Sequence, residues 1–233
     1  IRGDATRNNW GYAYLISGNT SITTGYQAFG DDLRNAFSNH QTMPSDDTQK
    51  PRHADVRAPA SAFVLNLGAV STHTISSYVV FLYDDVYSVM YFGEWQVPYW
   101  RARLNNNVTS LINEAVSQYN SNIFDITASN ELVRTMLTNT GGQQYDALGS
   151  LVTRQVTGGM TKTWSTKFNR SQAYIKEISS SGNIHTVDIL FPSSPYFLWL
   201  YPELLRDHLV STLSYVNNDT GATYGLAFGP HDL

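Results

Sequence analysis

The hydrophobic pattern of this chain changes its period once, near Pro98, and this change constrains the fold more than any other feature. Before it, apolar and aromatic residues gather in short runs bounded by Asn, Ser and Gly, a pattern typical of β-strands. After it, apolar residues recur at helical spacing. Because strands and helices occupy separate halves of the sequence, the pattern predicts an α+β protein with two modules, residues 1–98 and 99–233.

Three runs in the first half are predicted to be strands, at residues 10–16, 62–67 and 77–83. Between the first two lies a polar stretch with three prolines, residues 31–59. Such a composition predicts a long loop or insertion, with a short helix at residues 31–37.

Three helices are predicted in the second half, the second of them after the breaker Gly141–Gly142 and the third with Pro202 in its first turn. The apolar residues that define the first are Val108, Leu111, Ile112, Ala115, Val116, Tyr119 and Ile123. Those of the second are Tyr145, Leu148, Val152 and Val156, and those of the third are Leu205, Leu209, Leu213 and Val216.

Composition excludes several classes of function. The net charge is −4 and no basic cluster occurs, which argues against a nucleic-acid partner. No apolar run approaches the roughly 18 residues of a membrane span. The chain has no cysteine, no zinc-binding spacing of histidines and no nucleotide-binding glycine loop, so neither a metal nor a cofactor is predicted. The polar start, Ile1 to Asp4, does not resemble a signal peptide and is typical of the interior of a longer chain.

Four N-x-[ST] sequons point to a secreted, extracellular glycoprotein, although the absence of cysteine by itself favours a reducing compartment. The candidate glycosylation sites are Asn19, Asn107, Asn169 and Asn218.

The best candidate site lies at residues 174–200, where Lys176, Glu177, His185 and Asp188 fall within thirteen residues beside an aromatic run. A hairpin-like return through the Ser/Gly/Asn stretch would bring Glu177 close to Asp188. Two neighbouring carboxyls in a partly dry site have their pKa values pushed apart, which suits a general acid and a general base. In the alternative interpretation, Lys176 and Glu177 face solvent and Asp188 caps a turn.

Two other acidic segments each allow two interpretations. Asp84–Asp85 follows an apolar strand and either ends it in a turn or reaches a cleft. The aromatic stretch of residues 91–100 surrounds Glu94 and forms either a ligand-binding wall or an apolar seam between the two modules.

Four sequence blocks resemble the secreted glutaminase A family of fungi, which bacteria also carry. The blocks are KEISSSGN with the following TVD, FP and FL (residues 176–198), YDDVYSVMYFGEWQVPYW (83–100), DALGSLVTRQ (146–155) and GPHDL (229–233). Their order and spacing agree with those of the family. The resemblance covers most of residues 60–233.

This resemblance implies a fragment, formed by the C-terminal part of a β-sandwich and the first helices of an α/α toroid that is truncated at its C-terminal end. It implies hydrolysis of L-glutamine to L-glutamate and ammonia, with the remainder of the parent chain as a partner. Glu177 or Asp188 would be the catalytic base, and Lys176 or Arg154 would hold the substrate carboxylate. The expected wall of the site includes His185, Tyr196 and Trp199.

Two other functions remain open from the residues. Glycoside hydrolases share the combination of a β-sandwich with a helical toroid and use paired carboxylates, so a glycan is an alternative substrate. A non-catalytic secreted glycoprotein is the third possibility.

Overall fold

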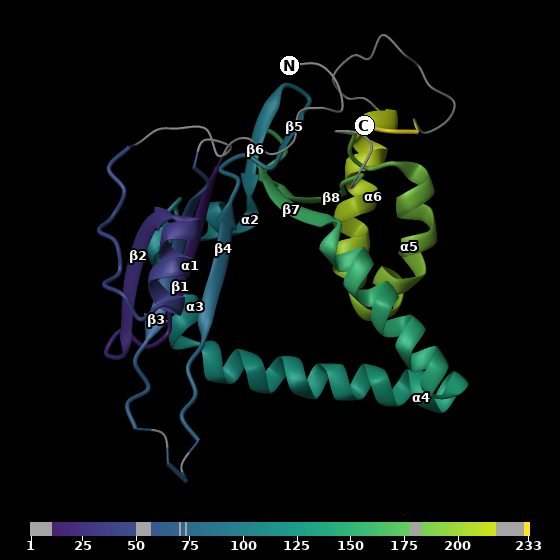
Figure 1. The fold of residues 1–233 in the computed structure, drawn as a ribbon. Helices are drawn as coiled ribbons and strands as arrows, with labels where there is room; N and C mark the ends of the chain where they lie inside the picture. Colours follow the sequence, from purple (N-terminus) through teal and green to yellow (C-terminus); the bar gives the residue numbers. More distant parts are fainter. Residues whose placement is uncertain (1–10, 50–56, 70, 73, 178–182, 218–230) are drawn as a thin grey trace. The chain divides into compact units, whose positions relative to one another are not determined.

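The computed structural model describes residues 11–49, 57–69, 71–72, 74–177, 183–217 and 231–233 (Figure 1). These residues form two compact units. One unit spans residues 12–84, and the other contains the chain from Asp85 onward.

In its described part, the unit of residues 12–84 contains two antiparallel strand pairs and a helix. β1 (Tyr12–Ser17) pairs with β4 (Val79–Asp84), and β2 (Thr23–Phe29) pairs with β3 (Pro59–Leu65). α1 (Gly30–Ser38) follows β2 directly and has two aspartates in its first turn. These carboxylates stabilise the helix because they lie at the positive end of its dipole.

A four-stranded antiparallel sheet is the centre of the second unit, and its strand order follows the sequence (Figure 1). The strands are β5 (Val89–Tyr91), β6 (Glu94–Pro98), β7 (Met160–Ser165) and β8 (Arg170–Ile175). They form two hairpins that join where Val97 of β6 pairs with Trp164 of β7.

Glu94 holds the turn between β7 and β8 in place. Its carboxylate accepts hydrogen bonds from the Ser165 hydroxyl at 2.5 Å, from the N–H and hydroxyl of Thr166 at 2.6 Å each, and from the Lys167 N–H at 3.2 Å. Burial raises the pKa of Glu94, but these hydrogen bonds lower it and outweigh burial. The acid of the aromatic stretch 91–100 is therefore occupied in stabilising a turn.

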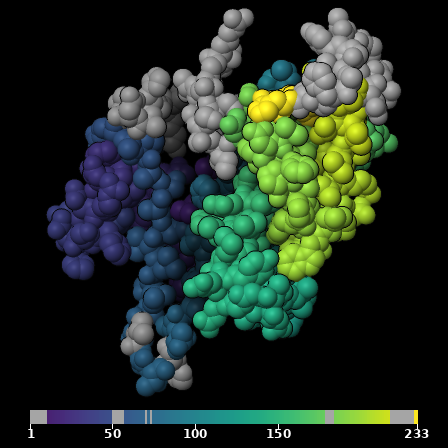
Figure 2. All heavy atoms as spheres, turned by 90° about the vertical axis from the view of Figure 1, so that its right-hand side faces the viewer, coloured from purple at the N-terminus to yellow at the C-terminus, as the bar shows by residue number. Residues whose placement is uncertain are grey.

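The helices of the second unit are α2 (Tyr99–Arg103), α3 (Val108–Ser117), α4 (Tyr119–Gly158), α5 (Val187–Leu200) and α6 (Pro202–Asn217). α4 consists of two arms that meet at Gly142, whose φ of 76° and ψ of −172° interrupt the helix. This backbone conformation suits glycine because it has no Cβ. α5 runs antiparallel to α6 and, in Figure 2, lies beside the second arm of α4.

Two clusters of buried side chains hold the helices against the sheet. One contains Ile175, Leu190, Tyr196 and Phe197, and the other contains Val89, Tyr91 and Tyr174. The Tyr91 hydroxyl also donates a hydrogen bond to the Ser211 carbonyl oxygen of α6 at 2.6 Å. Strand β8 and helix α6 thus share the best-buried part of this unit.

The structure confirms the α+β class and most of the elements predicted from periodicity. The predicted strands correspond to β1, β3 and β4, the short helix to α1, and the three later helices to α3, the second arm of α4, and α6. The kink at Gly142 lies at the predicted breaker.

The hydrophobic pattern did not indicate β2, β5, β6 or β7, which are short or rich in polar residues. The predicted module boundary at residue 98 also differs from the division of the structure, which falls between Asp84 and Asp85. The reason is the β6–β7 pairing, which ties residues 94–98 to a hairpin more than sixty positions later. The second module is accordingly not purely helical.

Candidate functional site

The segment predicted to form the site does return on itself after β8. Lys176 and Ile184 form an isolated antiparallel bridge, and the Glu177 N–H donates to the Asn183 carbonyl oxygen at 3.2 Å. The tip of this return, residues 178–182, lies outside the described residues. The chain then enters α5, whose first turn contains Asp188.

Asp188 contacts the last described residues of the chain. Its carboxylate lies 2.7 Å from His231 Nε2, and the carboxylate of Asp232 lies 2.8 Å from His231 Nδ1. Asp232 in turn accepts hydrogen bonds from the Thr186 hydroxyl at 2.6 Å and the Asn183 amide at 3.2 Å. One imidazole is thus placed between two carboxylates, and the second carboxylate is anchored to the loop before α5.

The geometry of this acid–histidine cluster, defined as Asp188, His231 and Asp232, favours a protonated imidazole. The hydrogen bond with Asp232 and the charge of Asp188 raise the pKa of His231. The hydrogen bond from Thr186 and the contact with His231 lower the pKa of Asp232. A histidine in such a position can exchange a proton with a bound molecule, since the cluster is open to solvent.

Lys176 is held near Asp85, with Nζ 3.9 Å from the Asp85 carboxylate. Burial lowers the pKa of Lys176, and the nearby Asp85 opposes this effect. Glu177, its neighbour, is half-buried. Lys176 and Glu177 thus lie directly after β8, before the chain returns, whereas Asp188 lies after the return, in α5.

His185 belongs to the protein core and does not line the site. The residue is only 3% exposed, its Nε2 lies 2.8 Å from the His208 carbonyl oxygen, and its ring stacks on the His208 ring at 5.4 Å. The Tyr174 ring packs against the His185 ring, and the Phe197 ring packs against the His208 ring, so both imidazoles have aromatic neighbours. The sequence pattern did not distinguish this buried histidine from an exposed one.

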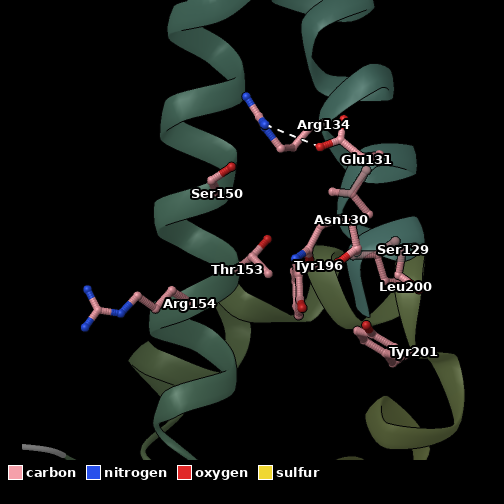
Figure 3. A pocket seen from close by; sticks show the side chains of 12 residues that line it. Ser129, Asn130, Glu131, Arg134, Ser150, Thr153, Arg154, Tyr196, Leu200 and Tyr201 are labelled. Carbon is pink, nitrogen blue, oxygen red and sulfur yellow. Dashed lines mark ion pairs between the residues drawn. The ribbon is translucent and has the colours of Figure 1, made fainter. Parts of the chain in front are cut away.

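A pocket of about 420 Å³ lies between the two arms of α4 and the C-terminal end of α5 (Figure 3). Ser150, Thr153 and Arg154 line it from one arm, and Ser129, Asn130, Glu131 and Arg134 from the other. Tyr196, Leu200 and Tyr201 close it from α5 and the residue after it. We call this the α4–α5 pocket.

Two predicted substrate-binding residues, Arg154 and Tyr196, line the α4–α5 pocket. The Arg154 side chain extends from the helix away from the other labelled side chains in Figure 3. Tyr196 is 9% exposed, and burial is the main cause that raises the pKa of its phenol. Trp199 is 44% exposed and is not among the residues that line the pocket.

The predicted site residues therefore fall in two separate places. Asp188 and Tyr196 are eight positions apart on α5, which corresponds to about 12 Å along an α-helix. Lys176 and Glu177 pair with residues 183 and 184, just before α5, and Asp188 lies in the first turn of that helix, whereas Arg154 and Tyr196 line the pocket at its C-terminal end. The sequence analysis assigned all of them to one site, but the length of α5 separates Asp188 from Tyr196.

The sequence analysis did not assign His231 and Asp232 to the site, nor Glu131 and Arg134 to a pocket. The GPHDL block was a usable signal for the first pair, because it is a motif beyond the predicted helices. For the second pair no local signal exists, since the kink of α4 brings them together with Ser150 and Thr153.

The residues with described positions contain no group of three or more His, Cys, Asp or Glu side chains arranged to hold a metal ion. They also contain no helix that is both long and apolar enough to span a membrane.

Comparisons with known proteins agree on one family. The model of the glutaminase A six helical-hairpin domain matches residues 142–233, and that of a domain of unknown function, DUF5127, matches residues 2–130. Glutaminase A of Aspergillus oryzae is 27% identical over 213 residues, which cover 89% of this chain and 30% of that protein. A protein of Arthroderma benhamiae named "Probable glutaminase" is 36% identical over 107 residues, which cover 41% of this chain and 12% of that protein.

The chain thus spans about 30% of the length of the Aspergillus relative. No solved structure matches it. The two family models together cover both the strand-rich and the helical parts, and the A. oryzae match extends over most of the chain. The chain belongs to the glutaminase A family.

Proposed function

We propose that this chain is part of a secreted amidohydrolase that converts L-glutamine to L-glutamate and ammonia. The observation that carries this proposal is the similarity to glutaminase A across 89% of the chain. The whole reaction requires a water molecule to add its oxygen to the side-chain amide carbon. The C–N bond then breaks, and the leaving nitrogen takes up a proton to depart as ammonia.

The catalytic groups of the proposal are Glu177 and Asp188. One carboxylate would remove a proton from the attacking water, and the other group would donate a proton to the leaving nitrogen. His231 lies 2.7 Å from Asp188 and offers a path for that proton. Lys176 lies one residue before Glu177, and as a cation it is suited to hold the substrate carboxylate near this end of α5.

We further propose that residues 12–84 are part of a β-sandwich and that α4 to α6 begin an α/α toroid. The two antiparallel strand pairs support the first statement. The second is supported by large apolar side chains that are exposed on α4, α5 and α6. Phe124 is 73% exposed, Phe191 79% and Leu198 65%. Further helical hairpins of the parent chain would cover such side chains.

The decisive test is ammonia release from L-glutamine by the 233-residue chain and by the full-length protein. The full-length protein is expected to release ammonia, and Asp188→Asn or Glu177→Gln should each lower its kcat by at least about 100-fold, a typical loss for a general acid or base. Glu203→Gln is the matched control, because Glu203 is an exposed acid on α6 whose side chain is 75% accessible.

Three results have different meanings. If both carboxylate variants keep full activity while the full-length protein releases ammonia, the function holds and the catalytic assignment is wrong. If the full-length protein releases no ammonia but frees reducing sugar from glycans, the chain belongs to a carbohydrate-active enzyme. Activity toward neither substrate would favour a non-catalytic glycoprotein.

If the protein is secreted as proposed, we expect N-glycans on its exposed sequons. Asn19 and Asn107 are exposed, and each uses its side-chain oxygen to accept a local backbone N–H, which leaves the amide nitrogen available. Asn169 is exposed in the β7–β8 turn, with a φ of 49°. Asn218 lies outside the described residues. In a eukaryotic secretory host, peptide mapping after enzymatic deglycosylation should show Asn converted to Asp at Asn19, Asn107 and Asn169.

The matched control for each site is the loss of its sequon hydroxyl, as in Thr109→Ala for Asn107. Unmodified asparagine at all three positions in protein recovered from the medium would contradict the glycoprotein assignment.

A further inference from the structure

The N-terminal end of α5 is held by a distant part of the chain. Thr186 is its N-cap residue, and a threonine hydroxyl in this position normally accepts a hydrogen bond from an N–H of the first turn. The Thr186 side chain makes no such bond. Its hydroxyl donates to the Asp232 carboxylate at 2.6 Å, and the Val187 N–H donates to the His231 carbonyl oxygen at 2.8 Å. The start of the helix is therefore tied to His231 and Asp232.

The backbone fixes these two residues in place. We call His231, Asp232 and Leu233 the HDL segment. The Leu233 N–H donates to the Ile184 carbonyl oxygen at 3.0 Å, and the Leu233 side chain packs against the buried cluster that contains Tyr174. Because His231 is also bonded through its carbonyl oxygen, the backbone is held on both sides of Asp232.

Both oxygens of the Asp232 carboxylate are occupied. Oδ1 accepts from the Thr186 hydroxyl, and Oδ2 accepts from the Asn183 side-chain amide at 3.2 Å and lies 2.8 Å from His231 Nδ1. Thr186 is 3% exposed, so this anchor belongs to the protein interior. The hydrogen bond from Thr186 and the contact with His231 lower the pKa of Asp232. The carboxylate is thus ionised at neutral pH and fixed in orientation.

The orientation of Asp232 determines which nitrogen of His231 exchanges a proton. An ionised carboxylate can only accept hydrogen bonds, so Nδ1, which faces it, must carry a hydrogen. Nε2 then points to Asp188, at 2.7 Å. In the described part of the chain, Asp232 on the HDL segment and Asp188 on α5 are the charged groups that act on His231, and both raise its pKa. Nε2 is therefore the nitrogen that gains and loses a proton.

We propose that Asp232 is a positioning residue, which orients His231 for proton transfer at Nε2, and that Thr186 holds Asp232 in place. The proposal rests on the glutamine hydrolysis proposed above and gives the two carboxylates of that reaction different roles. Glu177 takes a proton from the attacking water, whose oxygen adds to the amide carbon. The Asp188–His231 pair, which carries the imidazolium proton, gives it to the nitrogen as the C–N bond breaks and ammonia leaves. Return of the proton from Glu177 to the pair restores the enzyme.

The first measurement follows the His231 imidazole of the 233-residue chain by NMR as the pH is varied. Its signal, one of six from histidines, is the one that disappears in His231→Gln. The pKa of His231 should lie above the ordinary value of about 6.5, and Asp232→Asn should bring it down toward that value, because a negative charge is lost. Thr186→Val, which removes only the hydroxyl, should lower the pKa by a smaller amount.

The second measurement is glutamine hydrolysis by the full-length protein. Asp232→Asn should lower kcat about 10- to 100-fold with little change in KM, and Thr186→Val about threefold to tenfold, because the proton donor remains but is poorly oriented. The alkaline limb of the pH profile should move to lower pH in both variants, since the pKa of the proton donor falls. A merely structural role of Asp232 would lower kcat without moving this limb.

Two variants serve as matched controls. Thr186→Ser keeps the hydroxyl and should match the unsubstituted protein in both measurements. Asp125→Asn removes an exposed carboxylate from the first arm of α4 and should also have no effect. Urea unfolding of each variant separates loss of the proton donor from loss of folding.

The proposal is overturned if the pKa of His231 is the same in Asp232→Asn as in the unsubstituted chain, or if Thr186→Val matches Thr186→Ser in both measurements. It is equally overturned if the pKa falls while kcat and the pH profile of Asp232→Asn stay unchanged. If the full-length protein releases no ammonia, the proposed hydrolysis fails, and the pKa of His231 then decides by itself whether Asp232 orients the imidazole.

Discussion

Below pH 6.5 the second unit is expected to lose about 1.4 kcal/mol of unfolding free energy per pH unit for each of its two buried histidines. Burial lowers the pKa of His185 to about 4, opposed by the His208 carbonyl oxygen. Burial, reinforced by the charge of His185, lowers the pKa of His208 to about 3. Both rings are therefore neutral in the folded protein at neutral pH.

The direction of the effect follows from proton binding. Between pH 6.5 and about 4, unfolded histidines bind protons while the folded ones do not, so acid favours the unfolded state. The two rings stack at 5.4 Å, which makes a double charge especially unfavourable. Asp207, next to His208 in sequence, attenuates the loss because its charge raises the pKa of His208.

Urea unfolding followed by tryptophan fluorescence at pH 7.5, 6.5, 5.5 and 4.5 measures this loss. Four of the five tryptophans, at positions 95, 100, 164 and 199, report on the second unit. His208→Phe keeps a planar ring and the backbone carbonyl that His185 contacts, so it should roughly halve the slope below pH 6.5. The exposed His40, in the other unit, offers a control as His40→Asn, which should leave the slope unchanged.

A stability that is constant from pH 7.5 to 4.5 would show that the two histidines are not buried as the structure places them. If the slope of unfolding free energy against pH is the same in His208→Phe as in the unsubstituted chain, the acid sensitivity comes from other groups.

The second large effect is expected from Gln96→Ala, which should lower the unfolding free energy by about 3 to 5 kcal/mol. Gln96 is fully buried in β6. Its Nε2 donates to Gln172 Oε1 at 2.8 Å, and its Oε1 accepts from the hydroxyls of Thr163 at 2.6 Å and Tyr174 at 3.3 Å. Truncation would leave three buried polar groups with fewer partners and open a cavity between three strands.

The same unfolding experiment at pH 7.5 measures this change, with Gln155→Ala on the exposed side of α4 as the matched control. A combined variant, Gln96→Leu, Thr163→Val and Gln172→Leu, removes most of the polar network at once. It should be less destabilised than the sum of its single changes, because few unpaired groups remain. A loss below about 1 kcal/mol for Gln96→Ala would mean that water replaces the amide without cost.

The larger features of the fold follow from patterns within short windows of sequence. Helical spacing identified α3, the second arm of α4, and α6, because one face of each helix must be apolar to pack. The Gly141–Gly142 pair predicted the break in α4, since only glycine adopts the required φ easily. The β7–β8 hairpin was missed because its alternating polar residues are buried through pairing with β6, a contact distant in sequence.

The candidate site shows the same division between local and distant information. The spacing of Glu177 and Asp188 predicted an acid pair, and the return that joins their segments is present. The partner of Asp188, His231, is forty-three positions away, and no local pattern could place it there. His185 was assigned to the site because its neighbours are charged, but its ring packs against those of Tyr174 on β8 and His208 on α6.

The sequence by itself determined the α+β class, the family resemblance and the kink position, because each depends on residue type and short-range spacing. Tertiary structure alone decided that residues 85–98 join the second unit, that His185 is buried, and that Arg154 and Tyr196 share a pocket distant from Asp188. These outcomes depend on strand pairing and helix packing between residues far apart in the chain, and such contacts leave no periodic signal in either partner.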